Sequence, residues 1–164
     1  MNITPLQTSF IQSQWPLLSF WNYYTAILIN NKNINTNDVQ TLLEGRHQIL
    51  EFSLNENLYR INNIYAPPQC SERLDFWHGI SVLSKPECIN LIGGDFNCVL
   101  YLNRDRKSST PYHTDPFSIQ IFKKLTDFVD CYLSTSTNPL FTFSINTQSG
   151  SLLSRLDYVF IDSS

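Results

Sequence analysis

The stretch "LIGGDFNCVL" (Leu91–Leu100) changes abruptly from apolar to polar residues. Its apolar part, with the preceding "IN", is typical of a short buried strand, and Asp95 and Asn97 follow directly. A buried carboxylate costs free energy unless it is paired, hydrogen-bonded or bound to a metal. Because the end of a buried strand holds its side chains rigidly, this position is a candidate functional site.

Three further polar residues lie where the sequence is otherwise rich in strand formers. Tyr65 ends a predicted strand just before two prolines, and Thr142 and Asp157 lie within apolar, β-rich stretches. Aspartate and asparagine together suit a hard cation, or a water molecule aimed at phosphorus. If these strand ends converge on one rim of a sandwich, their side chains form one site.

Each of these residues also has a purely structural explanation. Asp95 could cap a turn, and Asn97 could adopt the left-handed conformation that asparagine tolerates. Asp157 could pair with the nearby Arg155. Buried ion pairs and turns imitate functional sites in this way, so spacing alone leaves both explanations open.

Length and composition favour one globular domain over residues 1–164. The chain has 164 residues and 42% hydrophobic content, which is enough for a core. Its 11 basic and 14 acidic residues give a net charge of -3 and a pI near 5.5. That balance excludes a general polyanion-binding surface, although a local basic rim remains compatible with it.

The cysteines and the N-terminal sequence indicate a soluble intracellular protein, nuclear or cytoplasmic. The four cysteines form no C-x-x-C pair, so we expect reduced thiols rather than zinc ligands or disulfides. No basic segment opens the chain, and no apolar run approaches the length of a membrane span. No membrane partner is expected.

The clearest local prediction is a β-hairpin. "RHQILEFSL" (Arg46–Leu54) alternates between two faces, "NEN" supplies a turn, and "LYRINNIYAP" (Leu58–Pro67) returns as a strand. Before it, Tyr23–Ile29 is predicted as a strand and the polar run Asn30–Asp38 as a loop.

The remainder alternates irregularly between helices and strands. One helix is predicted from a Ser71 cap to Leu83. Another is predicted from Asp115, with an apolar face of Phe117, Ile121, Leu125, Phe128 and Val129. Leu140–Ile145 and Ser154–Ile161 are predicted as closing strands. This order favours an α/β sandwich over a doubly wound parallel sheet. The residues predicted to be buried on its strands are Phe52, Ile64, Leu91, Ile92, Phe143 and Val159.

Four motifs in order give the sequence a family resemblance. They are "NIYAP" (Asn63–Pro67), "GGDFN" (Gly93–Asn97), "FTF" (Phe141–Phe143) and "SRLDYVF" (Ser154–Phe160). The sequence resembles the endonuclease/exonuclease/phosphatase superfamily, and most of all the apurinic-type endonuclease domain of LINE-like (non-LTR) retrotransposons. The resemblance spans about Ala26 to Ile161 and implies a two-sheet β-sandwich flanked by helices.

The resemblance also implies roles for individual residues. Tyr65 matches the tyrosine that contacts the scissile phosphate, and Asp95 matches the aspartate that activates or orients the attacking water. Asn97 matches the asparagine that binds phosphate beside it. Asp157 matches the acidic residue that orients groups around the active site.

Two more residues and a cofactor complete the implied site. Thr142 matches a threonine near the substrate phosphate, and Arg155 is expected near the nucleic-acid backbone, where a planar cation holds phosphate. The implied reaction is hydrolysis of a DNA phosphodiester with Mg²⁺. Asp95 and Asn97 are candidate weak ligands of that ion. DNA is the implied partner, and no protein partner is indicated.

Three parts of the family pattern are missing. No strand with the expected asparagine precedes Met1, and in "LQTS" (Leu6–Ser9) the neutral Thr8 occupies the position of the metal-binding glutamate. The terminal Asp-His pair is also absent, and the three histidines (His47, His78, His113) do not fit its pattern. We therefore expect an incomplete sandwich, truncated at both ends, that is inactive as this fragment.

The leading hypothesis is an endonuclease-like domain of retrotransposon origin. An alternative is a phosphoesterase that acts on small phosphates or lipids, since the superfamily contains such enzymes. A third is a non-catalytic interaction module, whose binding would persist without Mg²⁺.

Overall fold

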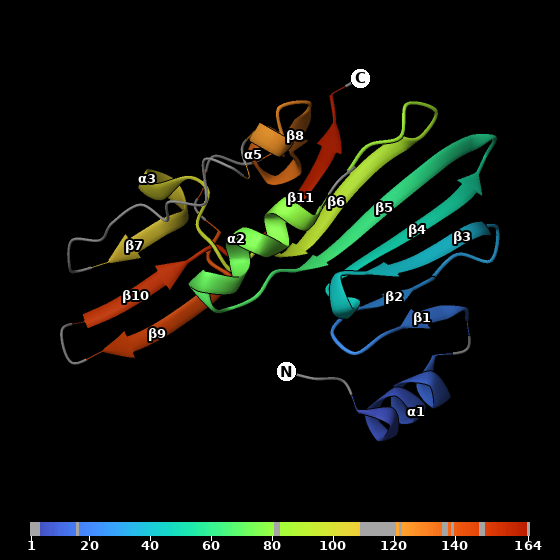
Figure 1. The fold of residues 1–164 in the computed structure, drawn as a ribbon, viewed down its shortest axis with the longest axis horizontal. Coiled ribbons are helices and arrows are strands. Elements are labelled where there is room, and N and C mark those ends of the chain that lie inside the picture. Colours follow the sequence, from blue (N-terminus) through green and yellow to red (C-terminus); the bar gives the residue numbers. More distant parts are fainter. Residues whose placement is uncertain are drawn as a thin grey trace.

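The computed structural model describes residues 4–15, 17–80, 83–108, 121, 123–135, 138, 140–147 and 150–163. Its centre is a six-stranded sheet in the order β3-β4-β5-β6-β11-β8 (Figure 1). Neighbouring strands in this sheet are antiparallel except for the parallel pair β5–β6. The strands are β3 (Asn35–Leu42), β4 (His47–Leu54), β5 (Asn57–Tyr65), β6 (Ile89–Asp95), β8 (Phe128–Asp130) and β11 (Asp157–Asp162).

Two smaller sheets and short helices complete the described chain. β1 (Ser19–Trp21) pairs with β2 (Ala26–Leu28), and a second sheet has the order β7-β10-β9. Its strands are β7 (Arg106–Ser108), β9 (Phe143–Thr147) and β10 (Gly150–Ser154). The helical elements are α1 (Pro5–Gln14), η1 (Leu43–Gly45), α2 (Cys70–Gly79), α3 (Leu102–Asp105) and α5 (Cys131–Thr135). No described helix has the length and apolar character that crossing a membrane requires. The predicted α/β class is confirmed.

The central sheet has a separate apolar cluster on each face. On one face, Trp77 of α2 packs in a cluster with Ile64 and Ile92, and Trp77 has no exposed surface. On the other face, Leu50 packs in a cluster that includes Ile27 of β2. Alternate residues of a strand point to opposite faces, so β5 contributes to both clusters.

The predicted hairpin is confirmed. β4 and β5 pair antiparallel from Leu54 opposite Asn57 to His47 opposite Ile64. The turn residues Asn55 and Glu56 both have positive φ, at 49° and 67°. Two such residues produce the turn twist that matches a two-residue hairpin.

The predictions for the first 40 residues need correction. Leu6–Ser9 lies in α1, where Thr4 and Gln7 form a capping box and Pro5 occupies the first turn, so Thr8 is not on a central strand. The Tyr23–Ile29 strand shortens to β2. The predicted Asn30–Asp38 loop contains the start of β3, a polar strand at the edge of the sheet. Polar side chains are suited to such an edge. Because this strand lacks a hydrophobic pattern, such a pattern could not reveal it.

Several predicted boundaries also differ from the structure. The helix predicted from Ser71 to Leu83 is α2, which begins at Cys70 after Gln69 and ends at Gly79. Phe128 and Val129 lie in β8 instead of a helix, whereas the helix start at Asp115 lies outside the described residues. The strand predicted over Leu140–Ile145 begins at Phe143. The one predicted over Ser154–Ile161 is divided between β10 and β11.

The burial predictions are correct for half of the residues. Phe52, Ile64 and Ile92 are buried and Leu91 is partly buried. Phe143 is 43% exposed and Val159 is 50% exposed, so the prediction is wrong for both. Val159 alternates with two buried aromatic residues and therefore points to the opposite face of β11.

Candidate phosphodiester site

Three of the predicted site residues lie side by side at the ends of adjacent strands. Tyr65 of β5 is paired in register with Asp95 of β6, and Asp95 is paired with Asp157 of β11. These strands come from distant parts of the sequence. The predicted convergence on one edge is therefore confirmed for these three residues.

The turn after β6 holds Asp95 and Asn97 in fixed positions. The backbone N–H of Asn97 donates to Asp95 Oδ1 over 2.8 Å, and its Nδ2 donates to Ala66 O over 2.7 Å. Asn97 has φ of 48°, the left-handed conformation expected for it. Between them, Phe96 is completely buried and its N–H donates to Leu156 O over 2.8 Å. The turn is therefore tied to β5, to the core and to the segment before β11.

Burial and a second carboxylate perturb Asp95. Burial raises the pKa of Asp95 above its usual range, and the negative charge of Asp157 raises it further. The hydrogen bond from the Asn97 N–H and the positive charge of Arg73 act in the opposite direction. The site thus holds two neighbouring carboxylates in different environments, because Asp95 is half-buried and Asp157 is exposed.

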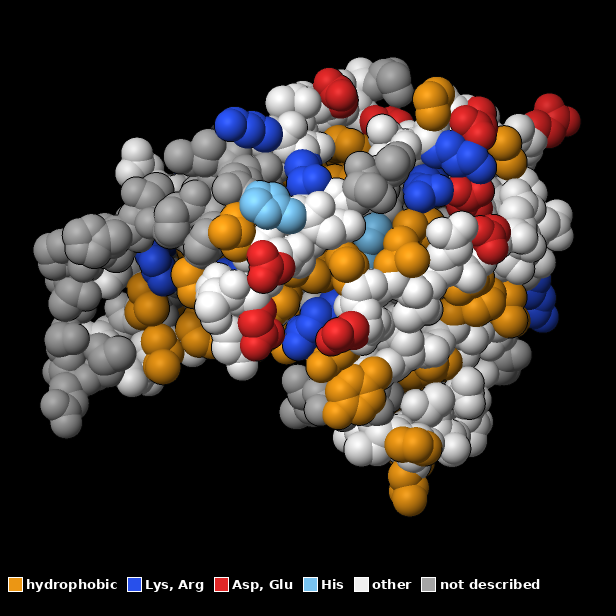
Figure 2. Space-filling view, in the orientation of Figure 1, with side chains coloured by type: hydrophobic (Ala, Val, Ile, Leu, Met, Phe, Trp, Pro, Cys, Tyr) orange, Lys and Arg blue, Asp and Glu red, His pale blue; other side chains and the backbone are white. Residues whose placement is uncertain are grey.

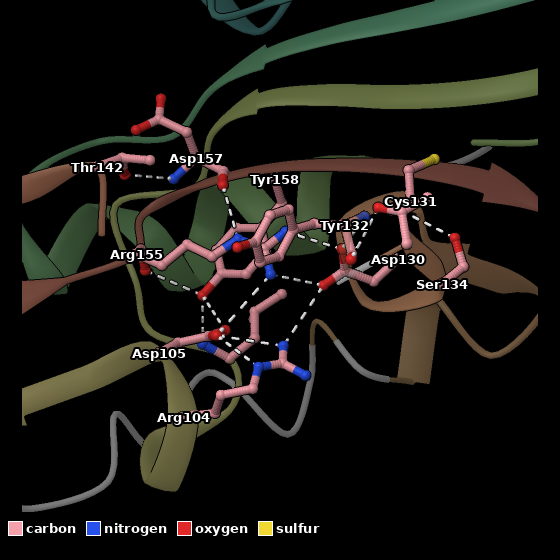
Figure 3. Close-up of polar contacts among 12 residues, drawn as sticks. Arg104, Asp105, Asp130, Cys131, Tyr132, Ser134, Thr142, Arg155, Asp157 and Tyr158 are labelled. Carbon is pink, nitrogen blue, oxygen red and sulfur yellow. Dashed lines mark hydrogen bonds and ion pairs between the residues drawn. The ribbon is translucent and has the colours of Figure 1, made fainter. Parts of the chain in front are cut away.

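Thr142 lies next to Asp157 (Figure 3). Its Oγ1 accepts hydrogen bonds from Leu156 N over 3.0 Å and from Asp157 N over 3.2 Å. A hydroxyl has two acceptor positions and one proton, so the Thr142 proton is left to donate elsewhere. Thr142 and Asp157 line the same groove of about 460 Å³, which also has an apolar wall that includes Leu140 and Val159.

Arg155 does not occupy the predicted position. It is 1% exposed, and its guanidinium forms two hydrogen bonds with the Asp130 carboxylate, over 2.9 and 2.8 Å. The expectation that Arg155 holds phosphate is therefore wrong, and so is the suggested pairing with the Asp157 carboxylate. A buried arginine needs a carboxylate partner, and no pattern in the sequence indicated that Asp130 would supply it.

Arg46 is a cation near the site that the sequence analysis missed. Its guanidinium carbon lies 4.1 Å from the ring centroid of Tyr24 and 5.3 Å from that of Tyr65, and these two rings stack at 5.6 Å. Its Nη1 is buried and has no hydrogen-bond partner among the described residues. The backbone N–H of Tyr65 also donates to Arg46 O over 2.8 Å. The predicted hairpin already placed Arg46 opposite the end of the strand that carries Tyr65, so this proximity could have been inferred from the sequence.

The surface around α2 carries both signs of charge. In Figure 2, Lys and Arg side chains are interspersed with Asp and Glu on this face, and the coloured residues form no continuous basic surface. This agrees with the net charge of -3. An anion on this face would therefore meet single cations and no continuous basic patch.

The described residues provide an incomplete set of metal ligands. They contain no group of three or more His, Cys, Asp and Glu side chains placed to hold one ion. Asp95 and Asp157 offer two carboxylates. Asn97 adds an amide oxygen, because its nitrogen is used by Ala66. Such a set would hold Mg²⁺ only with water molecules and substrate phosphates as the remaining ligands, which is how one or two carboxylates commonly bind this ion.

Neither histidine that the structure describes is part of the candidate site. His47 is buried, its Nε2 lies 3.0 Å from Asn62 Oδ1, and burial lowers the pKa of His47. His78 is an exposed residue near the end of α2. His113 lies outside the described residues.

Comparison with solved structures identifies the fold. TDP2 from D. rerio, solved in complex with a single-strand DNA product, matches with a TM-score of 0.67 and 14% identity, covering 99% of this chain and 69% of that one. A truncated TDP2 from Caenorhabditis elegans matches with a TM-score of 0.63 and 17% identity over 99% and 68% of the two chains. The endonuclease domain of TRAS1, a telomere-specific non-LTR retrotransposon, matches with a TM-score of 0.54 and 13% identity over 89% and 67%.

These matches show an endonuclease/exonuclease/phosphatase fold like that of the retrotransposon endonuclease domain. No family model and no curated protein matches the sequence.

Proposed function

We propose that this chain is a DNA-binding phosphodiesterase-like domain of the retrotransposon endonuclease type, with low hydrolytic activity. The observation that carries the proposal is the side-by-side placement of Tyr65, Asp95 and Asp157 at three adjacent strand ends. The fold shared with TDP2 and the TRAS1 endonuclease domain supports it. Groups that act on one phosphate need to lie around a common point, and this edge offers that point.

The proposed roles follow from the state of each side chain. Asp95 orients the attacking water, because its carboxylate is fixed by the Asn97 N–H. The hydroxyl groups of Tyr65 and Thr142 donate hydrogen bonds to phosphate oxygens. Asp157, which is paired in register with Asp95, orients the groups around the active site.

Arg46 is the proposed cation for the substrate phosphate, in place of Arg155. Tyr24 and Tyr65 hold its guanidinium beside the strand ends, and the Arg46 side chain is only half-buried, so part of it reaches solvent. A guanidinium forms paired hydrogen bonds with phosphate oxygens, and aromatic stacking restricts its orientation. Arg73 also acts on Asp95, but it is buried and donates to the carbonyls of Pro67 and Pro68, so Arg46 should make the main electrostatic contact with the phosphate.

Mg²⁺ is the proposed cofactor, with Asp95 and Asn97 as its weak ligands and Asp157 nearby. When bound, it would polarise a phosphoryl oxygen and steady the leaving oxygen. The incomplete set of ligands is the reason for expecting low activity, because loss of one preorganised stabilising group costs about 10²–10³ in rate.

The test measures DNA binding and DNA nicking separately. Binding of a fluorescent single-stranded oligonucleotide should weaken about tenfold in Arg46→Ala, the loss expected for one charge-assisted contact. Lys32→Ala removes an exposed cation elsewhere and serves as the matched control. Any Mg²⁺-dependent nicking of supercoiled plasmid should disappear in Asp95→Asn and persist in Asp38→Asn, a control at an exposed residue of β3.

Three results would contradict the proposal. Nicking that survives Asp95→Asn would place the chemistry elsewhere, and faster hydrolysis of inositol phosphates than of DNA would favour the small-phosphate enzyme. Oligonucleotide binding that is independent of Arg46, Asp95 and Mg²⁺ would favour the non-catalytic module.

A further inference from the structure

A buried polar network lies behind the candidate site. It joins Arg155, Asp130, Asp105 and Tyr158, none of which is more than 4% exposed, and Arg104 at its edge (Figure 3). Charged groups are rarely buried this completely. The network also holds residues 155–157 in place.

The Arg155 side chain connects two strands through three hydrogen bonds. Two of them form the fork with Asp130 of β8, and the third runs from Nε to the backbone carbonyl of Asp157 over 3.3 Å. Asp157 is the first residue of β11 and the partner of Asp95. The guanidinium therefore fixes the start of β11 to β8. Its face is covered by the Tyr158 ring at 4.4 Å and by the Tyr132 ring at 5.1 Å.

The second half of the network holds the backbone of Arg155. Its N–H donates to Asp105 O over 2.8 Å. The Tyr158 hydroxyl lies 3.0 Å from both Arg155 O and Asp105 Oδ2, and it accepts the Leu100 N–H over 2.9 Å. Asp105 thus holds this segment through its own carbonyl and, with Tyr158, through its side chain.

Every backbone polar group from Arg155 to Asp157 is bonded, although these residues form the break between β10 and β11. Besides the bonds above, Thr142 Oγ1 accepts the N–H groups of Leu156 and Asp157. Leu156 O accepts the N–H of Phe96, in the turn that carries Asp95. An irregular segment with all its groups satisfied has little freedom to move.

We infer that Arg155 is a positioning residue, which holds Asp157 opposite Asp95 through the buried network. A purely stabilising ion pair would need only the Arg155 guanidinium and a carboxylate. Here both the side chain and the backbone of Arg155 form hydrogen bonds that hold the segment leading to Asp157. The functional meaning of this inference rests on the proposed phosphodiester site. The positional claim concerns the geometry of residues 155–157 alone.

Arg60→Lys is a matched control for Arg155→Lys. Arg60 is also a buried arginine, and it pairs with Glu51 across β4 and β5. Lysine keeps the charge at either position but cannot reproduce the hydrogen bonds of the guanidinium. Asp130→Asn, which keeps the shape of the side chain, is a second variant should Arg155→Lys fail to fold.

The experiment measures amide hydrogen exchange and oligonucleotide binding in each variant. Arg155→Lys and Asp130→Asn should lower the protection of the Phe96, Leu156 and Asp157 amides at least about tenfold beyond the global change, because the loss is local. Both should also weaken oligonucleotide binding in Mg²⁺ as Asp157→Asn does. Arg60→Lys should leave these amides and the affinity unchanged.

The inference is overturned if both variants lose protection uniformly, as expected of a merely structural role, or if Arg60→Lys gives the same local loss. If Asp157→Asn leaves oligonucleotide binding and nicking unchanged while the local loss is observed, the proposed function fails and the positioning role stands. If Asp157→Asn weakens binding and neither network variant does, the positioning role fails and the proposed function stands.

Discussion

The two glycines before Asp95 should differ sharply in their tolerance of a methyl group. A Cβ added to Gly94 would lie 1.9 Å from Ile64 O and under 3.0 Å from two more backbone atoms of that residue. A Cβ added to Gly93 would meet Tyr158 O at 3.6 Å and Val159 Cγ2 at 3.7 Å, which are ordinary contacts. Gly94 also has φ of 135°, a conformation that strains any other residue.

The expected loss of stability for Gly94→Ala is at least ~3 kcal/mol. The backbone strain contributes about 1–3 kcal/mol, and relief of the overlap with Ile64 separates β5 from β6. Each hydrogen bond lost between these strands adds about 0.5–1.5 kcal/mol. Gly93→Ala should change the free energy of unfolding by less than ~1 kcal/mol, because it neither overlaps nor needs a positive φ.

Urea unfolding followed by tryptophan fluorescence measures the difference. A loss of ~3 kcal/mol lowers the urea midpoint by about 1–3 M at ordinary values of m. Equal midpoints for the two variants would refute the close approach of β5 and β6. A larger loss in Gly93→Ala than in Gly94→Ala would refute the register of the pair.

The remaining predictions concern buried charge. Arg155→Met should lower the free energy of unfolding by about 3–5 kcal/mol, since it leaves Asp130 buried without its main partner. Arg155→Met combined with Asp130→Leu should lose less than the sum of the single changes, as a double-mutant cycle in urea would show. Because burial and Asp157 raise the pKa of Asp95 above 3.8, this carboxyl favours folding at low pH, and its contribution is lost as the pH rises through the raised value. Asp95→Asn should therefore melt higher than the parent above that value, and Asp157→Asn should lower the pKa of Asp95 in a carbon NMR titration.

Local chemistry explains why the hairpin was predictable from sequence. Alternation along Arg46–Leu54 and a polar turn specify pairing between two consecutive segments of the chain, and the structure has that pairing. The edge shared by Tyr65, Asp95 and Asp157 was predictable because each residue ends or begins a strand. Buried strands place such ends at few positions in a sandwich.

Other features depend on contacts that a single sequence does not specify. The partner of Arg155 is Asp130, which lies 25 residues away in a stretch predicted to be helical. Exposure of Val159 depends on which face of β11 other elements cover. The stacking of Arg46 on Tyr24 depends on the β1–β2 hairpin, which brings Tyr24 against it.

The end of β6 and the turn after it hold consecutive residues of the fold and of the candidate site. Gly94 allows the approach of β5, Asp95 faces the site, Phe96 fills the core, and Asn97 ties the turn to Ala66. Most substitutions here should therefore affect stability and binding together, which makes loss of activity alone a poor indicator of a catalytic role. Asp95→Asn is the informative change, because it keeps the shape of the side chain, retains an acceptor for the Asn97 N–H and removes only the charge.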